Sequence, residues 1–176
     1  VIILMIDLSA AFDTVDHDIF ISFLRDHIGL DDTALNLIIS YLSDRSQQVS
    51  VKGILSELRE LVCYVPQGSV LGPIEFCIYM LPLGAILRFH KINYHIYADD
   101  STLYCSFQLD SPDEAIESMN DCLRDIRSWM IKNKLKIIDD KTEFLLVTSP
   151  KVSMNKDLNV TVGNCIPTEA RYPYVA

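Results

Sequence analysis

Two adjacent carboxylates sit between two β-favouring runs in the stretch Asn93-Tyr94-His95-Ile96-Tyr97-Ala98-Asp99-Asp100-Ser101-Thr102-Leu103-Tyr104-Cys105. Aromatic and β-branched residues dominate both sides of the pair, and this composition is typical of strands. The stretch therefore predicts a β-hairpin with Asp99 and Asp100 at its tip. Like charges side by side repel each other unless a cation shares them, so the tip is a candidate metal site. The alternative is an ordinary solvated turn, in which Asp is common.

A third carboxylate follows a strand at the start of the chain. Residues 1–6 form a continuous apolar run, typical of a central strand buried on both faces, and Asp7 comes directly after it. If this strand and the hairpin are neighbours in one sheet, Asp7, Asp99 and Asp100 gather at one edge. Such a cluster can bind two divalent ions, the usual device for in-line phosphoryl transfer. The alternative for Asp7 is a simple cap on the next turn.

The remaining periodicity predicts helices behind an antiparallel sheet. Apolar residues recur at helical spacing in four segments, one ended by Gly29 and another interrupted by Pro82, which should kink or end its helix. The predicted elements are helices at 19–28, 31–42, 74–89 and 112–133, a hairpin at 46–65 and strands at 143–148 and 159–166. This order predicts the α+β class, with a helix-backed and mostly antiparallel sheet.

Charge and cysteine usage exclude several classes of protein. The chain has 15 Lys and Arg against 24 Asp and Glu, a net charge of −9, so it is not a general binder of phosphate backbones. The five cysteines form no C-x-x-C pair, which indicates reduced thiols in an intracellular protein. Residues 1–6 are too few for a signal peptide, and the apolar segment 74–89 carries Glu75, Pro82 and Gly84, so no membrane partner is expected.

Three segments together resemble successive motifs of reverse transcriptases of the non-LTR (LINE-type) retrotransposon kind. They are Asp7-Leu8-Ser9-Ala10-Ala11-Phe12-Asp13-Thr14-Val15-Asp16-His17, Val65-Pro66-Gln67-Gly68-Ser69-Val70-Leu71-Gly72-Pro73 and Tyr97-Ala98-Asp99-Asp100. The resemblance runs from residue 1 to about 162. It implies the palm of a right-hand polymerase, with a partial palm domain at 1–166 and an irregular tail at 167–176. The fingers and thumb would be segments of a longer polyprotein, and this chain is interpreted as an excised piece.

The resemblance implies the reaction and its metal ions. The chain would be an RNA-directed DNA polymerase, a nucleotidyltransferase that uses an RNA template, a DNA primer and dNTPs in the nucleus or cytoplasm. Asp7, Asp99 and Asp100 would be the catalytic carboxylates. Together with the carbonyl of Leu8 they would hold two Mg²⁺ ions, for which Mn²⁺ is a substitute.

The resemblance also implies four nucleotide-binding residues. Phe12 would reject a ribose 2′-hydroxyl, Gln67 and Gly68 would line the incoming nucleotide and template, and Lys141 would give a proton to the departing pyrophosphate. The alternatives are an ordinary core phenylalanine for Phe12 and a solvated turn lysine for Lys141.

Two residues depart from the family pattern. Tyr64 stands where the family usually has glycine, and Glu75 stands where it tends to be apolar. These departures favour a second hypothesis, a truncated and non-catalytic retrotransposon remnant that acts at most as a protein-interaction module. An unrelated two-metal phosphotransferase or nuclease is a third, against which the segment 66–68 argues. As a palm alone, the chain is expected to be marginally stable or to associate.

Overall fold

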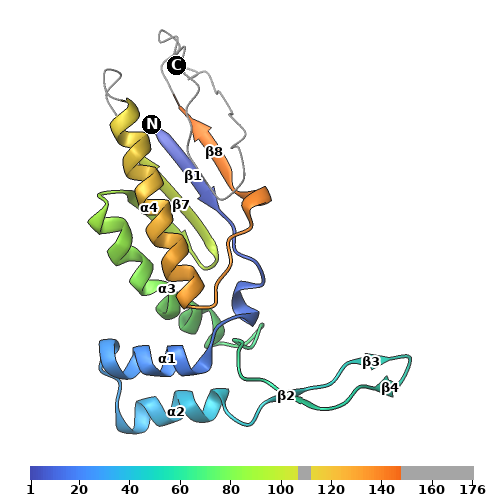
Figure 1. Cartoon of the computed structure of the whole chain (residues 1–176). Coiled ribbons are helices and arrows are strands. Elements are labelled where there is room, and N and C mark those ends of the chain that lie inside the picture. The colour runs from blue at the N-terminus through green and yellow to red at the C-terminus, as the bar shows by residue number, and fades with distance from the viewer. Residues whose placement is uncertain (107–111, 148–176) are drawn as a thin grey trace. The chain divides into compact units, whose positions relative to one another are not determined.

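The computed structural model describes residues 1–106 and 112–147, and the chain divides into two compact units (Figure 1). Unit 1 comprises Val1–Ser9 and Met80–Ala176, and unit 2 comprises Ala10–Tyr79. The strand predicted at 159–166 and the tail predicted at 167–176 lie outside the described residues.

Unit 1 contains a four-stranded antiparallel sheet in the order β6-β7-β1-β8. Its strands are β1 (Ile2–Ile6), β6 (Asn93–Tyr97), β7 (Asp100–Cys105) and β8 (Glu143–Leu146). The first strand of the chain is central, because β1 pairs with β7 on one side and with β8 on the other. The predicted α+β class, the hairpin and the antiparallel sheet are therefore confirmed.

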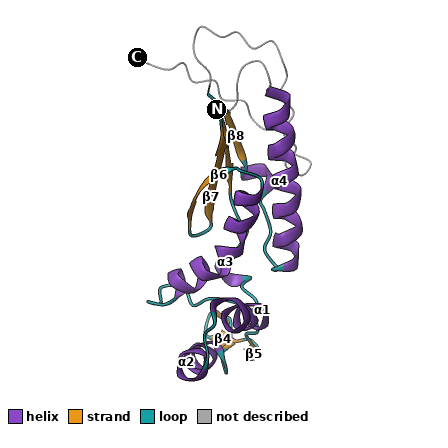
Figure 2. Ribbon diagram, turned by 90° about the vertical axis from the view of Figure 1, so that its left-hand side faces the viewer, coloured by secondary structure: helices purple, strands orange, loops and turns teal. Residues whose placement is uncertain are grey.

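The two faces of this sheet differ in burial. Ile2, Leu4 and Ile6 of β1 are at most 3% exposed, whereas the alternate residues Ile3 and Met5 are half-buried. The prediction that this strand is buried on both faces is therefore wrong for one face. Helix α4 and the part of α3 that belongs to unit 1 lie on the same side of the sheet (Figure 2), so they can cover one face only.

Helix α4 (Pro112–Lys132) packs through one apolar stripe. The predicted stripe is confirmed, because its members are at most 9% exposed: Ile116, Met119, Leu123, Ile126 and Met130. Cys122 is also fully buried on this helix, and burial raises the pKa of its thiol to about 12. It is therefore an inert core thiol, as the cysteine pattern predicts.

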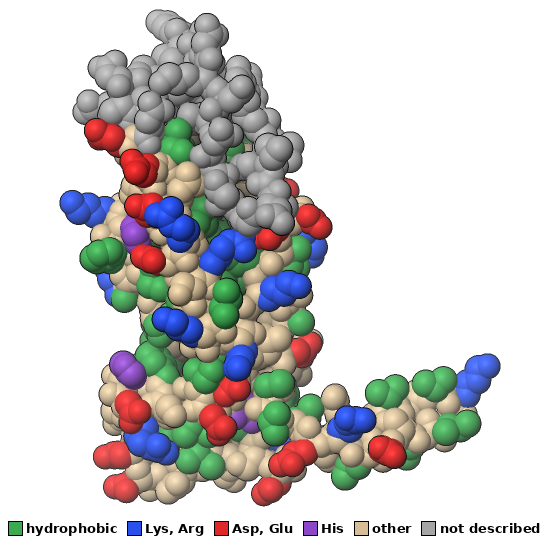
Figure 3. All heavy atoms as spheres, viewed as in Figure 1, with side chains coloured by type: hydrophobic (Ala, Val, Ile, Leu, Met, Phe, Trp, Pro, Cys, Tyr) green, Lys and Arg blue, Asp and Glu red, His purple; other side chains and the backbone are tan. Residues whose placement is uncertain are grey.

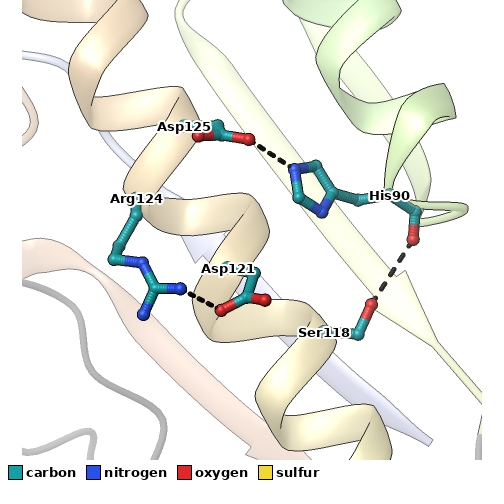
Figure 4. A network of polar contacts seen from close by, with 5 residues as sticks. All are labelled: His90, Ser118, Asp121, Arg124 and Asp125. Atoms are coloured by element: carbon teal, nitrogen blue, oxygen red, sulfur yellow. Dashed lines mark hydrogen bonds and ion pairs between the residues drawn. The ribbon is translucent and has the colours of Figure 1, made fainter.

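A polar network joins α4 to the end of α3 (Figure 4). His90 Nε2 lies 2.7 Å from Asp125 Oδ2, and the Ser118 hydroxyl donates to the His90 carbonyl at 3.4 Å. Next to it, Arg124 pairs with Asp121. The serine, histidine and aspartate do not form a catalytic triad, because the serine contacts the backbone of His90 and not its ring.

Helix α3 (Gly72–Phe89) begins in unit 2, ends in unit 1 and contains Pro82 without ending there. Of the two predicted effects of Pro82, a kink or an end of the helix, the end is therefore wrong, and the kink stays a prediction. Its neighbours Met80 and Leu83 are at most 1% exposed, and burial of their apolar area offsets the hydrogen bond that proline removes. By length and composition α3 could cross a membrane, but core helices pass the same test and 44% of it is buried.

Unit 2 begins with a helical pair whose boundaries match the sequence signals. Helix α1 (His17–Phe23) starts at Asp16, whose side chain accepts a hydrogen bond from the Ile19 amide at 3.0 Å. It continues as a π-helical turn to Gly29, which has φ +78° and ends the helix as predicted. Helix α2 (Asp32–Leu42) follows.

The predicted hairpin at 46–65 is a two-stranded arm of unit 2, here called the arm (residues 46–60; Figures 1 and 3). In it β2 (Ser46–Gln47) pairs with β5 (Arg59–Glu60), and β3 (Ser50–Val51) pairs with β4 (Ile54–Leu55). Every residue of these four strands is exposed. The alternating pattern thus predicts the strands correctly but not a buried face.

Candidate metal and nucleotide site

The carboxylates of the sequence motif lie at a tight two-residue turn. Tyr97 of β6 pairs with Asp100 of β7, which leaves Ala98 and Asp99 as the turn. Ala98 has φ +53°, a left-handed conformation that costs a non-glycine residue about 1–2 kcal/mol. The turn makes Asp100 the first residue of β7.

Strand register then brings a second carboxylate beside Asp100. Ile6 of β1 is opposite Ser101 of β7, so the next position along each strand sets Asp7 against Asp100. Side chains alternate between faces, which places both carboxylates on the half-buried face. There they line one cavity of about 570 Å³, here called the acidic hollow. It is lined by Met5, Ile6, Asp7, Asp100, Ser101, Thr102, Asp140, Lys141 and Glu143.

The acidic hollow attracts cations. Four of its lining residues are carboxylates and one, Lys141, is an ammonium, which gives a formal charge of −3. The Lys141 Nζ lies 3.1 Å from Asp7 Oδ2. Lys141 is therefore not a purely solvated turn lysine, although its side chain is 66% exposed. Its role in a site stays a prediction.

The donor set of the hollow fits a hard divalent ion. Mg²⁺ is usually held by one or two carboxylates together with substrate phosphates and water, and Asp7 and Asp100 can supply that pair. Within residues 1–106 and 112–147, no three His, Cys, Asp or Glu side chains form a group that could hold a metal ion. Asp99 is half-buried at the turn and is not among the residues that line the hollow, and Leu8 lies in a β-bridge with Ile137.

The other predicted nucleotide-binding residues lie in unit 2. The Phe12 ring stacks on Phe76 with centroids 4.6 Å apart, and its backbone carbonyl accepts a hydrogen bond from the Val65 amide at 2.6 Å. Gln67 donates from Nε2 to Asp13 Oδ1 at 3.4 Å. These contacts join the turn that carries Phe12 to the loop that carries Gln67.

The loop itself depends on two glycines for different reasons. Gly68 is exposed and has φ +77°, which a side chain at this position would strain. At Gly72 the limit is space, because a Cβ there would lie 2.8 Å from Ser69 Oγ and 2.9 Å from the Pro66 carbonyl oxygen. Ser69 holds the loop closed by donating to Pro66 O at 2.6 Å and accepting from the Gly72 amide at 3.0 Å.

Comparison with known proteins identifies the family of the chain. Residues 1–171 match the family described as reverse transcriptase (RNA-dependent DNA polymerase). The chain belongs to the reverse transcriptase family. It is also 30% identical over 175 residues to a protein of Drosophila melanogaster named "Probable RNA-directed DNA polymerase from transposon BS". That alignment covers 95% of this chain and 19% of the relative, so the chain spans about a fifth of the relative's length.

The family match confirms the predicted membership of the reverse transcriptase family, which is described as RNA-dependent DNA polymerase. The transposon relative agrees with the predicted non-LTR retrotransposon kind. The match reaches residue 171, beyond the point near 162 at which the sequence motifs cease to be recognisable.

The first departure of this reverse transcriptase domain, Tyr64, takes up a conformation suited to glycine. Its φ is +157°, in a region that costs other residues about 1–3 kcal/mol. Two hydrogen bonds of 2.9 Å hold it there: its amide donates to the Val15 carbonyl, and its own carbonyl contacts His17 Nε2. The backbone thus keeps the conformation suited to glycine although the residue has changed.

The second departure, Glu75, is buried as predicted. It is 2% exposed in the first turn of α3, and neither carboxylate oxygen has a hydrogen-bond partner. Burial raises the pKa of the Glu75 carboxyl, because the charged form is poorly solvated there. Such a group destabilises the reverse transcriptase domain, and no contact in the described residues compensates for it.

Sequence reasoning missed two carboxylates of the acidic hollow, Asp140 and Glu143. Glu143 is the first residue of β8 and pairs with Met5, so its face follows from a register that the sequence does not display. Asp140 lies in a 3₁₀ turn over Asp139–Lys141, in a segment whose Asp-Asp pair indicates only a turn. The nearest available signal was the closeness of both residues to Lys141 in sequence.

Proposed function

We propose that the acidic hollow is the nucleotidyl-transfer centre of an RNA-directed DNA polymerase and that it works with two divalent ions. The observation that carries the proposal is the facing pair Asp7 and Asp100 on neighbouring strands, with Lys141 as the cation that lines the hollow beside them. Membership of the reverse transcriptase family supports the reaction class.

The residues of unit 1 would have different roles according to their positions. Asp7 and Asp100 would hold the metal ions, with Asp99 at the turn and the Leu8 carbonyl as further oxygen donors. When bound, the ions supply activation of the attacking hydroxyl and neutralisation of the triphosphate. Lys141 lies where it can hold a proton beside the same carboxylates, which suits a donor to departing pyrophosphate.

The residues of unit 2 would shape the nucleotide's surroundings. The stack of Phe12 on Phe76 fixes the ring that would exclude a ribose 2′-hydroxyl. The exposed Gln67 and Gly68 would receive the nucleotide and the template. On this proposal the partners are an RNA template, a DNA primer and dNTPs in the nucleus or cytoplasm, and fingers and thumb segments would supply the basic surface that a chain of net charge −9 lacks.

Two measurements on the full 176-residue chain test this proposal. Titration with Mn²⁺, followed by electron paramagnetic resonance, should show binding that Asp7→Asn weakens at least tenfold, whereas equal binding by both proteins would overturn the proposed site. Primer extension on an RNA template with dNTPs, in Mg²⁺ and in Mn²⁺, then tests the reaction. Incorporation that Asp99→Asn/Asp100→Asn loses would establish the polymerase centre.

A second candidate function is favoured by Tyr64 and Glu75. A strained residue in the nucleotide loop and an unpartnered buried carboxyl are what a remnant that has lost its catalytic role would accumulate. Such a chain would act at most as a protein-interaction module. A well-folded sample that binds Mn²⁺ but incorporates no dNTP would favour this function for the chain.

A further inference from the structure

We propose that Lys141 is a place-holding cation: its ammonium occupies Asp7 until a divalent ion arrives, so that metal binding and release of Lys141 are one exchange. This inference rests on the proposed function, because it assigns the metal to the acidic hollow. It begins from the contact of 3.1 Å between Lys141 Nζ and Asp7 Oδ2.

The backbone brings Lys141 to this carboxylate. The Ile138 amide donates to the Asp7 carbonyl at 2.9 Å, so the segment before the lysine is fastened to the residue with which the lysine pairs. The Lys141 amide and the Thr142 hydroxyl both donate to the Ile138 carbonyl, at 3.2 Å and 3.0 Å. These bonds fix the 3₁₀ turn, so the backbone keeps the Lys141 side chain within reach of Asp7.

The strength of the contact suits an exchange. The Lys141 side chain is 66% exposed and the Asp7 side chain 29%, and ion pairs as accessible as this contribute little free energy. A lysine carries its charge on a flexible stem, so the ammonium can leave the carboxylate while the turn stays in place. Because the pair is weak, it can yield to a competing cation.

The surroundings favour a divalent competitor. Besides Asp7, the hollow is lined by Asp100, Asp140 and Glu143, so with Lys141 its lining residues carry a formal charge of −3. A doubly charged ion at Asp7 would interact with all four carboxylates more strongly than the ammonium does. The displaced ammonium would stay at the mouth of the hollow, available to the substrate only when the metal is bound. By linkage, removal of the ammonium must tighten metal binding.

Mn²⁺ affinity is the first test, measured on the full chain and its variants. Lys141→Met keeps the length of the stem and removes the charge, and it should bind Mn²⁺ about two- to fivefold more tightly than wild type. Lys141→Arg keeps the charge and should not bind more tightly. Lys132→Met is the matched control, because it removes one exposed lysine of unit 1 that does not line the hollow, and its affinity should equal that of wild type.

The state of the lysine itself is the second test, because it does not depend on activity. In a sample labelled with ¹⁵N-lysine, the NH₃⁺ resonance of Lys141 is assigned by its loss in Lys141→Arg. Without metal, its chemical shift should differ from that of Lys132. Saturating Mg²⁺, or Asp7→Asn without metal, should move it toward the Lys132 value. If Mn²⁺ binding depends on Asp7 but Mg²⁺ leaves the Lys141 resonance unchanged, the exchange is overturned and the proposed function still stands. If Mn²⁺ binding does not depend on Asp7, the proposed function itself fails.

Discussion

Asp7 in the acidic hollow and Glu75 in the first turn of α3 are two carboxyl groups in opposite circumstances. Asp7 follows the last residue of the central strand β1, where water reaches the end of the sheet, and Lys141 Nζ lies 3.1 Å from Asp7 Oδ2. Glu75 is 2% exposed and neither of its oxygens has a partner. An acid that must stay charged to bind a metal needs access and a counter-charge, and only Asp7 has both. Asp7 thus has the surroundings that a metal-binding carboxylate needs, whereas the acid at Glu75 has no structural explanation.

The largest effect is expected from Asp7→Asn. It should weaken Mn²⁺ binding at least about tenfold, because it removes the charge of the proposed ligand while it preserves its shape. Folding, followed by circular dichroism, should be unchanged. Asp18→Asn, which neutralises an exposed acid of α1, is the matched control and should bind Mn²⁺ like wild type.

Glu75→Leu removes the buried, unpartnered carboxyl and should stabilise the protein by about 2 kcal/mol at pH 7, measured by urea unfolding. The folded pKa of Glu75 is raised above its unfolded value of 4.5, so the unfolded chain releases this proton first. Stability should therefore fall as pH rises from the unfolded pKa to the folded pKa, and Glu75→Leu should remove that slope. Glu60→Leu, on the exposed arm, should change stability by less than about 0.5 kcal/mol. Equal effects of the two substitutions would contradict the assignment of Glu75 as a buried, unpartnered acid.

Gly72→Ala, at the end of the loop that carries Gln67 and Gly68, should destabilise the protein by about 1–2 kcal/mol, since the new methyl meets the Pro66 carbonyl at 2.9 Å. Urea unfolding measures this cost. Ala85→Gly in α3 is the reference for the size of this loss of stability, because a glycine at an exposed helical position costs about 1 kcal/mol through backbone freedom alone. A neutral Gly72→Ala would show that the loop is not closed as described.

The smallest effect is expected at the turn between β6 and β7. Ala98→Gly should stabilise the protein by about 0.5–1 kcal/mol, because glycine adopts φ +53° without the steric cost that alanine bears. Thermal unfolding of the two proteins gives the difference. A loss of stability would mean that the turn is not strained and that the gain in unfolded-state freedom dominates.

Much of the fold follows from local signals in the sequence. Gly29 and Asp16 mark helix ends through backbone chemistry that acts within a few residues, and the structure places them accordingly. The apolar run before Asp7 predicts a central strand, which is confirmed. The continuation of α3 through Pro82 was not predictable in this way, because burial by residues distant in sequence decides it.

In the candidate site, too, local motifs could be predicted from the sequence and long-range contacts could not. The motifs give Asp7 and Asp100, and the sheet register brings these two residues together. As functional residues, all the sequence candidates remain predictions: Asp7, Asp99, Asp100, Leu8, Phe12, Gln67, Gly68 and Lys141. The contribution of Asp140 and Glu143 depends on the pairing of β8 with β1, and the contact of Lys141 with Asp7 depends on a backbone bond across 131 residues of chain, from Asp7 to Ile138. Neither has a local signature.

The central place of β1 makes the acidic hollow sensitive to strand alignment. Because β1 pairs with both β7 and β8, a slip of one residue would turn the Asp7 side chain to the buried face of the sheet, away from the hollow. A misaligned sheet would then bury a charge and lose the proposed metal ligand in the same event. The residue proposed to hold the metal thus also penalises incorrect folding, so selection for catalysis and selection for a single strand alignment act on one position.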